Sequence, residues 1–217
     1  MAYTMPCPVC ETAPTRPFLR VDDLDYLRCD TCQARFLDPA RRPAAPAERA
    51  HYLHHENRVD DPGYRRFLSK LAEPLLARLP GPGLRGLDYG CGPGPALAAM
   101  LREAGHSVAL YDPFFFPAPE PLRRTYDFIT CTEVVEHFHH PAAEFRRLAA
   151  LLRPGGLLGI MTCFQTDDAR FAQWHYRRDP THVVFYREAT FHAIAARHGW
   201  VCEVPGKDVV MMRMGGG

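Results

Sequence analysis

The segment that most constrains this chain is a loop with three alternating glycines, Asp88-Tyr89-Gly90-Cys91-Gly92-Pro93-Gly94. Residues 84–89 are predicted to form a β-strand that leads into this loop, and residues 95–104 are predicted to form a helix that ends at Gly105. Glycine lets a backbone turn sharply and approach a ligand closely, where a Cβ would block both. This order of strand, glycine turn and helix predicts the start of an α/β sheet.

The remainder of the chain continues the alternation of strand and helix. Strands are predicted at residues 108–111, 126–131 and 157–162, helices at 61–79, 141–152 and 188–198, and a terminal strand pair at 200–204 and 208–212. Such alternation is typical of a mostly parallel sheet covered by helices on both faces. Pro74 should kink or divide its helix, and the prolines of residues 38–50 predict a linker without helix before about Ala47.

Length and charge limit the possible classes of protein. The 217 residues allow one α/β domain and a small appendage. The net charge of +1 indicates no polyanionic partner. No apolar run approaches 18 residues and no signal pattern is visible, so we expect no membrane contact and a cytoplasmic location.

Asp112 follows the predicted strand 108–111. An acidic residue in this place can hydrogen-bond both hydroxyls of a ribose. Asp112 could instead serve only the turn at the strand end, and the three glycines could form a tight turn that binds no ligand.

Several segments together resemble the class I S-adenosylmethionine-dependent methyltransferases. Asp88 followed by Gly90-Cys91-Gly92-Pro93-Gly94 resembles their motif I, and the GxGxxG pattern of dinucleotide enzymes is absent. Residues 126–138 resemble the fourth strand of that family, and Leu152-Arg153-Pro154-Gly155-Gly156 resembles the turn before the fifth. The resemblance spans about residues 50–213 and implies a Rossmann-like fold with S-adenosylmethionine as methyl donor.

The resemblance also implies where the donor binds, with Asp112 on the ribose. The expected donor-binding residues are Asp88, Gly90, Cys91, Gly92, Gly94, Asp112, Pro113, Phe114, Thr132 and Glu133. One segment departs from the family. Between Asp112 and Asp127 the chain is short and rich in proline, where the family has a helix, a third strand and an acidic residue for the adenine. Phe114 or Phe115 could cover the adenine by stacking, or could fill the sheet edge.

Two CxxC pairs, Cys7 with Cys10 and Cys29 with Cys32, form a CxxC-x18-CxxC pattern. Four thiolates at this spacing can close a tetrahedral Zn²⁺ site, and a closed site has a structural role. A redox pair is the alternative, but it lacks the usual βαβ context. The other four cysteines, Cys91, Cys131, Cys163 and Cys202, lie in or beside predicted strands and are interpreted as small packing residues.

Methyl transfer requires the acceptor to be aligned with the methyl group and sometimes to lose a proton. Two clusters follow predicted strands: Glu133, Glu136 and His137, and the polar, aromatic stretch 174–186. The candidate catalytic residues are His182, His175, Glu133, His137, Tyr176 and Arg177. An imidazole could act as general base, and Arg177 or Arg178 could hold an acidic acceptor. The stretch could also be a self-bonded loop that closes the sheet, and His54 and Asn57 could contact the donor.

The predicted organisation is a zinc ribbon (1–40), a linker with a lid helix (41–80) and a methyltransferase core (81–217). Residues 1–50 hold seven arginines and seven acidic residues, so the ribbon lacks the basic patch of an RNA-binding module. We therefore expect a small-molecule acceptor and no nucleic acid. An RNA or protein methyltransferase that docks its substrate on the ribbon is the first alternative, and a non-catalytic nucleoside-binding domain is the second. The oligomeric state is left open.

Overall fold

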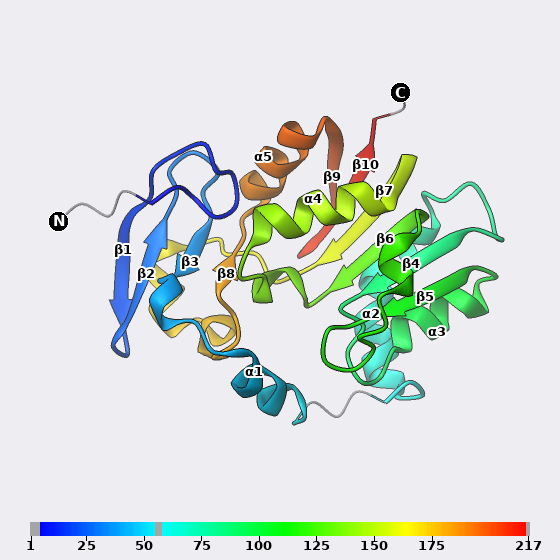
Figure 1. Cartoon of the computed structure of the whole chain (residues 1–217), viewed down its shortest axis with the longest axis horizontal. Helices are drawn as coiled ribbons and strands as arrows, with labels where there is room; N and C mark the ends of the chain where they lie inside the picture. Colours follow the sequence, from blue (N-terminus) through cyan, green and yellow to red (C-terminus); the bar gives the residue numbers. More distant parts are fainter. Residues whose placement is uncertain (1–4, 55–57, 216–217) are drawn as a thin grey trace.

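A six-stranded sheet organises the larger part of the chain in a computed structural model that describes residues 5–54 and 58–215 (Figure 1). The strands lie in the order β5-β4-β6-β7-β10-β9. Their bounds are Arg85–Tyr89 (β4), Ser107–Tyr111 (β5), Tyr126–Thr132 (β6), Leu152–Met161 (β7), Trp200–Gly206 (β9) and Val209–Met214 (β10). Neighbours from β5 to β7 pair in parallel, and β10 is antiparallel to both of its neighbours. The predicted mostly parallel sheet with a terminal strand pair is confirmed.

Helices cover both faces of this sheet, as predicted. On one face lie α2 (Pro62–Leu76) and α3 (Ala96–Glu103), and on the other lie α4 (Pro141–Leu151) and α5 (Glu188–His198). Side chains alternate between the two faces along each strand. In β6, for example, Phe128 packs in the cluster that contains α2 and α3, and Ile129 packs in the cluster that contains α4 and α5.

Three local predictions change at proline or glycine. Pro74 was expected to kink or divide a helix, but α2 continues undivided to Leu76 because this proline lies in its last turn. Helix α1 (Ala45–Tyr52) begins two residues earlier than predicted, since Pro46 occupies its first turn, where no N–H bond is lost. Strand β7 begins at Leu152, so it includes the residues that were expected to form a turn. Gly199 ends α5 as predicted, with a φ of 66°.

The segment between β5 and β6 is as short as the sequence indicated. Residues 112–125, all of which are described, contain a single bridge between Asp112 and Phe116 and the short 3₁₀ helix η2 (Glu120–Arg123). No additional strand forms in this segment, and β5 is therefore the edge of the sheet.

A second, smaller sheet is formed mainly by the N-terminal segment that carries the two CxxC pairs. We call residues 5–38 the cysteine module; its strands are β1 (Arg16–Val21), β2 (Leu24–Arg28) and β3 (Arg35–Leu37). A fourth strand, β8 (Val184–Phe185), comes from the far end of the chain and pairs with β3. Buried residues of the module and of the large sheet form one continuous hydrophobic cluster, so the module packs as part of the core.

Helix α1 connects the cysteine module to the larger part of the chain (Figure 1). The carbonyl of His139 accepts a hydrogen bond from Arg42, which precedes the helix. Among residues 5–54 and 58–215, no helix is long and apolar enough to cross a membrane.

Candidate active site

A cavity of about 650 Å³ opens at the carboxyl ends of β4, β5 and β6, beside α1. This is the edge where parallel α/β sheets bind their ligands. The ten residues that the sequence proposed for donor binding all lie in its wall: Asp88, Gly90, Cys91, Gly92, Gly94, Asp112, Pro113, Phe114, Thr132 and Glu133. The volume is within the range of small-molecule sites.

Two glycines of the loop are required for different physical reasons. Gly90 has a φ of 78°, and a Cβ on it would lie 2.6 Å from both methyl carbons of Val134. Gly92 has a φ of 62°, but a Cβ there would meet nothing within 4 Å. The first glycine therefore allows the loop to pack against the protein, and the second leaves open space beside the cavity.

Asp112 joins the glycine loop to the turn after β5. Its carboxylate accepts hydrogen bonds from the backbone N–H of Gly92 (3.0 Å), Phe114 (2.8 Å) and Phe115 (3.0 Å). Asp112 therefore shapes a turn and also lies in the cavity wall, and its contact with a ribose stays a prediction. A carboxylate has about four acceptor positions, and three are used here.

Asp88 lies buried at the end of β4, where the Thr130 hydroxyl donates a hydrogen bond to it (2.9 Å). Burial raises the pKa of Asp88 to about 6, because a charged carboxylate is costly away from water. Thr132 follows on β6, and its buried hydroxyl oxygen has no hydrogen-bond partner among the described residues. A buried polar atom in a cavity wall without a protein partner fits a contact with a bound ligand.

Aromatic side chains meet where α1 reaches the cavity. The ring of Tyr52, the last residue of α1, lies 5.5 Å from Phe114 and 5.3 Å from His137 between ring centroids. Phe114 therefore faces both the cavity and the helix that covers it, rather than only filling the sheet edge.

Two histidine–carboxylate pairs hold α1 in place. His139 Nε2 lies 2.8 Å from a carboxylate oxygen of Glu48, and His51 Nε2 lies 3.1 Å from Asp179 Oδ2. Glu48 belongs to α1 and is buried beside the cavity. Helix α1 thus lies along one side of the cavity, and its role as a lid stays a prediction. His54 is exposed, and Asn57 lies outside the described residues.

Three polar side chains in another part of the cavity wall form what we call the histidine wall: His137, Asp179 and His182. The two imidazole rings are 4.7 Å apart between centroids. The Nδ1 of His137 bonds the carbonyl of Thr181 (3.0 Å), and the Nδ1 of His182 bonds the carbonyl of Tyr176 (2.7 Å). Since a carbonyl only accepts, each Nδ1 carries a proton, and Nε2 is the remaining ring nitrogen.

Behind this wall lies Glu136, which is completely buried in the short helix η3 (Val135–His137). Its carboxylate accepts hydrogen bonds from the hydroxyls of Tyr176 and Thr162. Burial and the nearby Glu133 raise the pKa of Glu136 well above its usual range.

Of the other predicted catalytic residues, Glu133 lines the cavity, but Tyr176 and His175 do not. Glu133 lies in the cavity wall with a φ of 52°, and burial raises its pKa to about 7. Tyr176 lies behind the wall with its hydroxyl on Glu136. His175 is exposed and lines neither this cavity nor a smaller one of about 250 Å³ beside it.

Arg177 is also placed away from the large cavity. Its guanidinium pairs with Asp22 (2.9 Å) and lies over the ring of Tyr26, so it ties stretch 174–186 to the cysteine module. The suggestions that His175 acts as a base and that Arg177 holds the acceptor are therefore not supported by their placement.

Sequence reasoning missed several residues of the cavity wall. Asp179 belongs to the polar stretch 174–186 and Tyr52 to the predicted lid segment, but the sequence assigned neither residue a role in the site. Other wall residues without a prior role are Glu48, Tyr64, Phe67, Tyr111, Phe138, His139, Glu144 and Arg147. Tyr111 could have been found from the sequence, because it directly precedes Asp112 at the end of a predicted strand. Glu48 and Tyr52 could not, because they lie at the cavity only through the packing of α1.

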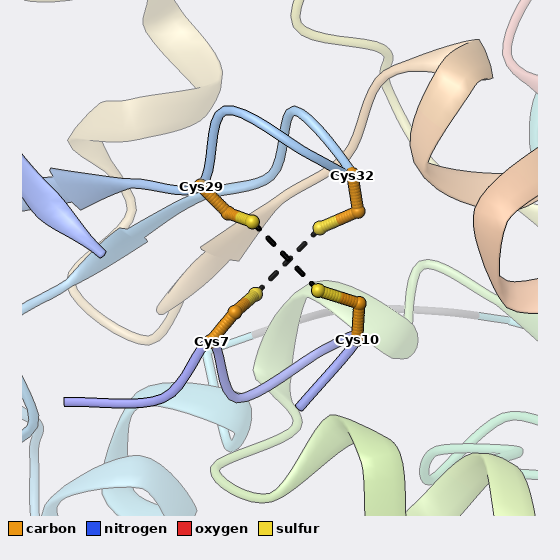
Figure 2. Close-up of side chains that lie close together, drawn as sticks. All are labelled: Cys7, Cys10, Cys29 and Cys32. Carbon is orange, nitrogen blue, oxygen red and sulfur yellow. Dashed lines mark hydrogen bonds between the residues drawn. The ribbon is translucent and has the colours of Figure 1, made fainter. Parts of the chain in front are cut away.

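The four module cysteines point toward a common centre (Figure 2). Cys7 and Cys32 have sulfurs 3.6 Å apart, those of Cys10 and Cys29 are 3.7 Å apart, and all four residues are buried. A tetrahedral zinc with bonds of about 2.3 Å places its sulfurs about 3.8 Å apart. The residues therefore fit such an ion. Among the remaining cysteines, Cys131 is buried and Cys91, Cys163 and Cys202 are half-buried.

The sequence of this chain is similar to those of known methyltransferases. Residues 52–203 match the family described as methyltransferase domain. The ubiquinone biosynthesis O-methyltransferase of Xanthomonas campestris pv. campestris (strain B100) is 32% identical over 123 residues, which cover 44% of this chain and 49% of that protein. The same enzyme of Aeromonas salmonicida is 32% identical over 103 residues, which cover 37% of this chain and 43% of that protein. The chain thus spans about half the length of the curated relatives it matches.

Solved structures show the same fold at low sequence identity. The magnesium protoporphyrin IX methyltransferase of Synechocystis PCC 6803 with bound SAM has a TM-score of 0.53 and 18% identity, covering 79% of this chain and 92% of that one. An O-methyltransferase family protein from Burkholderia thailandensis also has a TM-score of 0.53, with 15% identity over 82% of this chain and 64% of that one.

Proposed function

This chain belongs to the methyltransferase domain family, and from that premise we propose that it transfers a methyl group from S-adenosylmethionine to a small organic acceptor. The observation that carries the proposal is that the predicted donor-binding residues and the histidine wall line one cavity. When bound, S-adenosylmethionine supplies a methyl group on a positively charged sulfur, and the sulfur keeps the bonding electron pair as the acceptor attacks the methyl carbon.

The residues on the glycine side would hold the donor. Gly92 leaves room for close approach of a ligand to the backbone, and the open acceptor position of Asp112 suits a ribose hydroxyl. Phe114 offers an aromatic face where the family's third strand is missing. These contacts fix the position of the methyl group, and such alignment is a major contribution that a protein makes to a group transfer.

The histidine wall would orient the acceptor. Imidazole and carboxylate groups at the cavity surface can bind an acceptor hydroxyl or amine and can receive the proton that it loses. His137 and His182 remain our candidates for this role, together with Asp179. By name, the curated relatives are O-methyltransferases, so oxygen acceptors deserve the first tests.

The size of the acceptor follows from the cover over the cavity. Helix α1 closes the site through its contacts with His139 and Asp179, which leaves a space suited to a metabolite. Residues 1–50 carry balanced charge, which speaks against RNA docking on the cysteine module. Small organic acceptors also agree with the names of similar proteins, which refer to ubiquinone biosynthesis and to magnesium protoporphyrin IX.

We further propose that the four module cysteines hold one structural zinc ion. The sulfur spacing, the burial of all four residues and the closed coordination shell support this assignment. A cytoplasmic location, which agrees with reduced cysteines, stays a prediction.

Two measurements test the proposed reaction. Calorimetry should detect binding of S-adenosylmethionine and S-adenosylhomocysteine, and labelled donor should transfer its label to a compound in a metabolite extract. An Asp112→Ala variant should lose donor affinity by at least about tenfold, since each ribose contact to a carboxylate contributes more than 1 kcal/mol. A folded, zinc-loaded protein that binds neither compound would exclude the enzyme and favour a partner-binding role.

A further inference from the structure

Three side chains at the acceptor side of the cavity bring metal-binding atoms together. Glu136, His137 and His182 each place one possible ligand atom within 4.8 Å of the other two. Glu136 and His137 are neighbours in η3, and His182 comes from the segment that leads into β8. Both histidines lie in the cavity wall, so this cluster adjoins the space where an acceptor would lie.

The orientation of both imidazoles suits metal ligation. In each ring Nδ1 donates to a backbone carbonyl, that of Thr181 for His137 and that of Tyr176 for His182. Metal-binding histidines almost always anchor their second nitrogen in this way, which fixes the ring and makes the other nitrogen a better ligand. Nε2 of His182 lies 4.0 Å from Glu136 Oε1.

Glu136 is anchored like a metal-binding carboxylate. The hydroxyls of Tyr176 and Thr162 donate to its two oxygens. Glu136 is completely buried, and within the described parts of the chain no lysine or arginine forms an ion pair with it. A metal ion bound here would give this buried carboxyl group a cationic partner, which compensates for its removal from water. Asp179 adds a second carboxylate, with Oδ2 at 3.8 Å from His182 Nε2.

We propose that Glu136, His137 and His182 bind a divalent transition-metal ion that holds the acceptor. The inference rests on the proposed methyl transfer and deepens it. Two imidazoles and one carboxylate suit Zn²⁺, Mn²⁺, Fe²⁺ or Co²⁺ better than Mg²⁺ or Ca²⁺. Bonds of about 2.1 Å place tetrahedral ligand atoms about 3.4 Å apart, so the 4.0 Å separation needs only a small closure.

Such an ion would define the class of acceptor. Because both histidines lie in the cavity wall, the remaining coordination positions would face the cavity, where an acceptor oxygen can bind. A coordinated hydroxyl has a lowered pKa and loses its proton to water more easily, which makes its oxygen a stronger nucleophile. Acceptors with two adjacent oxygens, such as vicinal diols or ortho-dihydroxy aromatic compounds, could chelate the ion.

Titration with Mn²⁺, followed by electron paramagnetic resonance, tests this site in the 217-residue chain with its cysteine module loaded with zinc. Mn²⁺ favours nitrogen and oxygen ligands over thiolates, so it does not report on the cysteine site. We expect one bound Mn²⁺ per chain. Glu136→Gln and His182→Ala should each weaken its binding by at least about tenfold, and Tyr176→Phe should weaken it less.

His175→Ala is the matched control, because this exposed histidine belongs to the same stretch and lines neither cavity. It should bind Mn²⁺ like the wild type. Glu136→Gln preserves the size of the side chain and one of its two acceptor oxygens, so circular dichroism can separate its loss of metal from misfolding. Equal Mn²⁺ affinity in the wild type and in both ligand variants overturns the proposal, as does no binding at millimolar Mn²⁺.

Calorimetry with S-adenosylhomocysteine on the same samples separates the two ideas. Binding of this compound without any Mn²⁺ site removes only the metal inference. Failure to bind it removes the proposed function itself, whatever the metal result.

Discussion

The two sides of the cavity are assembled in different ways. On the donor side, the glycine loop, Asp112 and the turn after it lie within 28 consecutive residues, and backbone N–H groups provide their main contacts. The histidine wall joins residues 137, 179 and 182, and its neighbours include α1 and the cysteine module. Local sequence therefore determines the donor side, and tertiary packing determines the acceptor side.

The largest expected effect is on the side of the histidine wall, from removal of the proposed zinc ion. Strand β8 pairs with the cysteine module two residues after His182, so loss of the ion should release the histidine wall. Structural zinc contributes on the order of 10 kcal/mol in small zinc domains, and we expect several kcal/mol here. Hydrogen exchange after chelation, or in Cys29→Ser, should accelerate strongly in residues 176–186 and little in residues 88–94.

Cys202→Ser is the control for that experiment, because this half-buried cysteine lies outside the four-cysteine cluster. Equal acceleration of exchange in both segments would show that the two sides of the cavity unfold as one unit, and the comparison would fail.

The next largest effects are expected on the donor side, where alanine substitutions at Gly90 and Gly92 should change stability and ligand affinity differently. Gly90→Ala should lower the free energy of unfolding by about 4 kcal/mol, because its methyl group overlaps Val134 and its φ is positive. Gly92→Ala should cost only about 1 kcal/mol, from the positive φ alone, yet it should weaken S-adenosylhomocysteine binding more than tenfold. Urea unfolding and calorimetry measure these two quantities. A Gly92→Ala variant with normal affinity would show that the donor does not approach this loop.

Asp88 gives the donor side a distinct pH dependence. Its pKa is raised from 3.8 to about 6 in the folded protein, so folding favours the protonated form. The corresponding stability is fully present below about pH 4 and is lost as pH rises through 6, with a size of up to about 3 kcal/mol. Asp88→Asn should remove this slope from urea unfolding measured between pH 4 and 7. An unchanged difference between variant and wild type across that range would contradict the assignment.

The smallest effect concerns the cover over both sides. His139→Ala removes one contact between α1 and the core and should lower stability by about 1 kcal/mol. It should also accelerate release of S-adenosylhomocysteine a few-fold in stopped-flow measurements, since Glu48 loses its partner. His175→Ala should change neither property, with any stability effect within about 0.5 kcal/mol. Identical release rates for both variants would show that α1 does not cover the donor.

The sequence supported different parts of the structure unequally. Strand–helix alternation and the glycine loop predicted the large sheet because both signals are local. The CxxC pairs predicted which cysteines meet, since metal-ligand spacing limits the possible partners. A lid segment was predicted from the family resemblance, but neither the pairing of β8 with β3 nor the contacts that hold α1 could be predicted, because they join residues that are distant along the chain.

The same limit explains the mixed result for stretch 174–186. Its composition indicated a functional segment, but composition does not show which side chains face a cavity. Tyr176 and Arg177 turn toward Glu136 and the cysteine module, and Asp179 and His182 face the cavity. Short 3₁₀ turns, η4 (Asp168–Gln173) and η5 (His175–Arg178), lack the regular periodicity that would have separated these faces.

The pairing of β3 with β8 also sets an order of events during protein synthesis. Proteins leave the ribosome from the N-terminal end, so β1 to β3 emerge long before their fourth strand, about 150 residues later. Until then β3 is an open edge that another chain could join. Early capture of zinc by the nascent cysteines would hold this edge in shape until β8 arrives, and translation in zinc-depleted cells should therefore yield aggregated rather than soluble, metal-free protein.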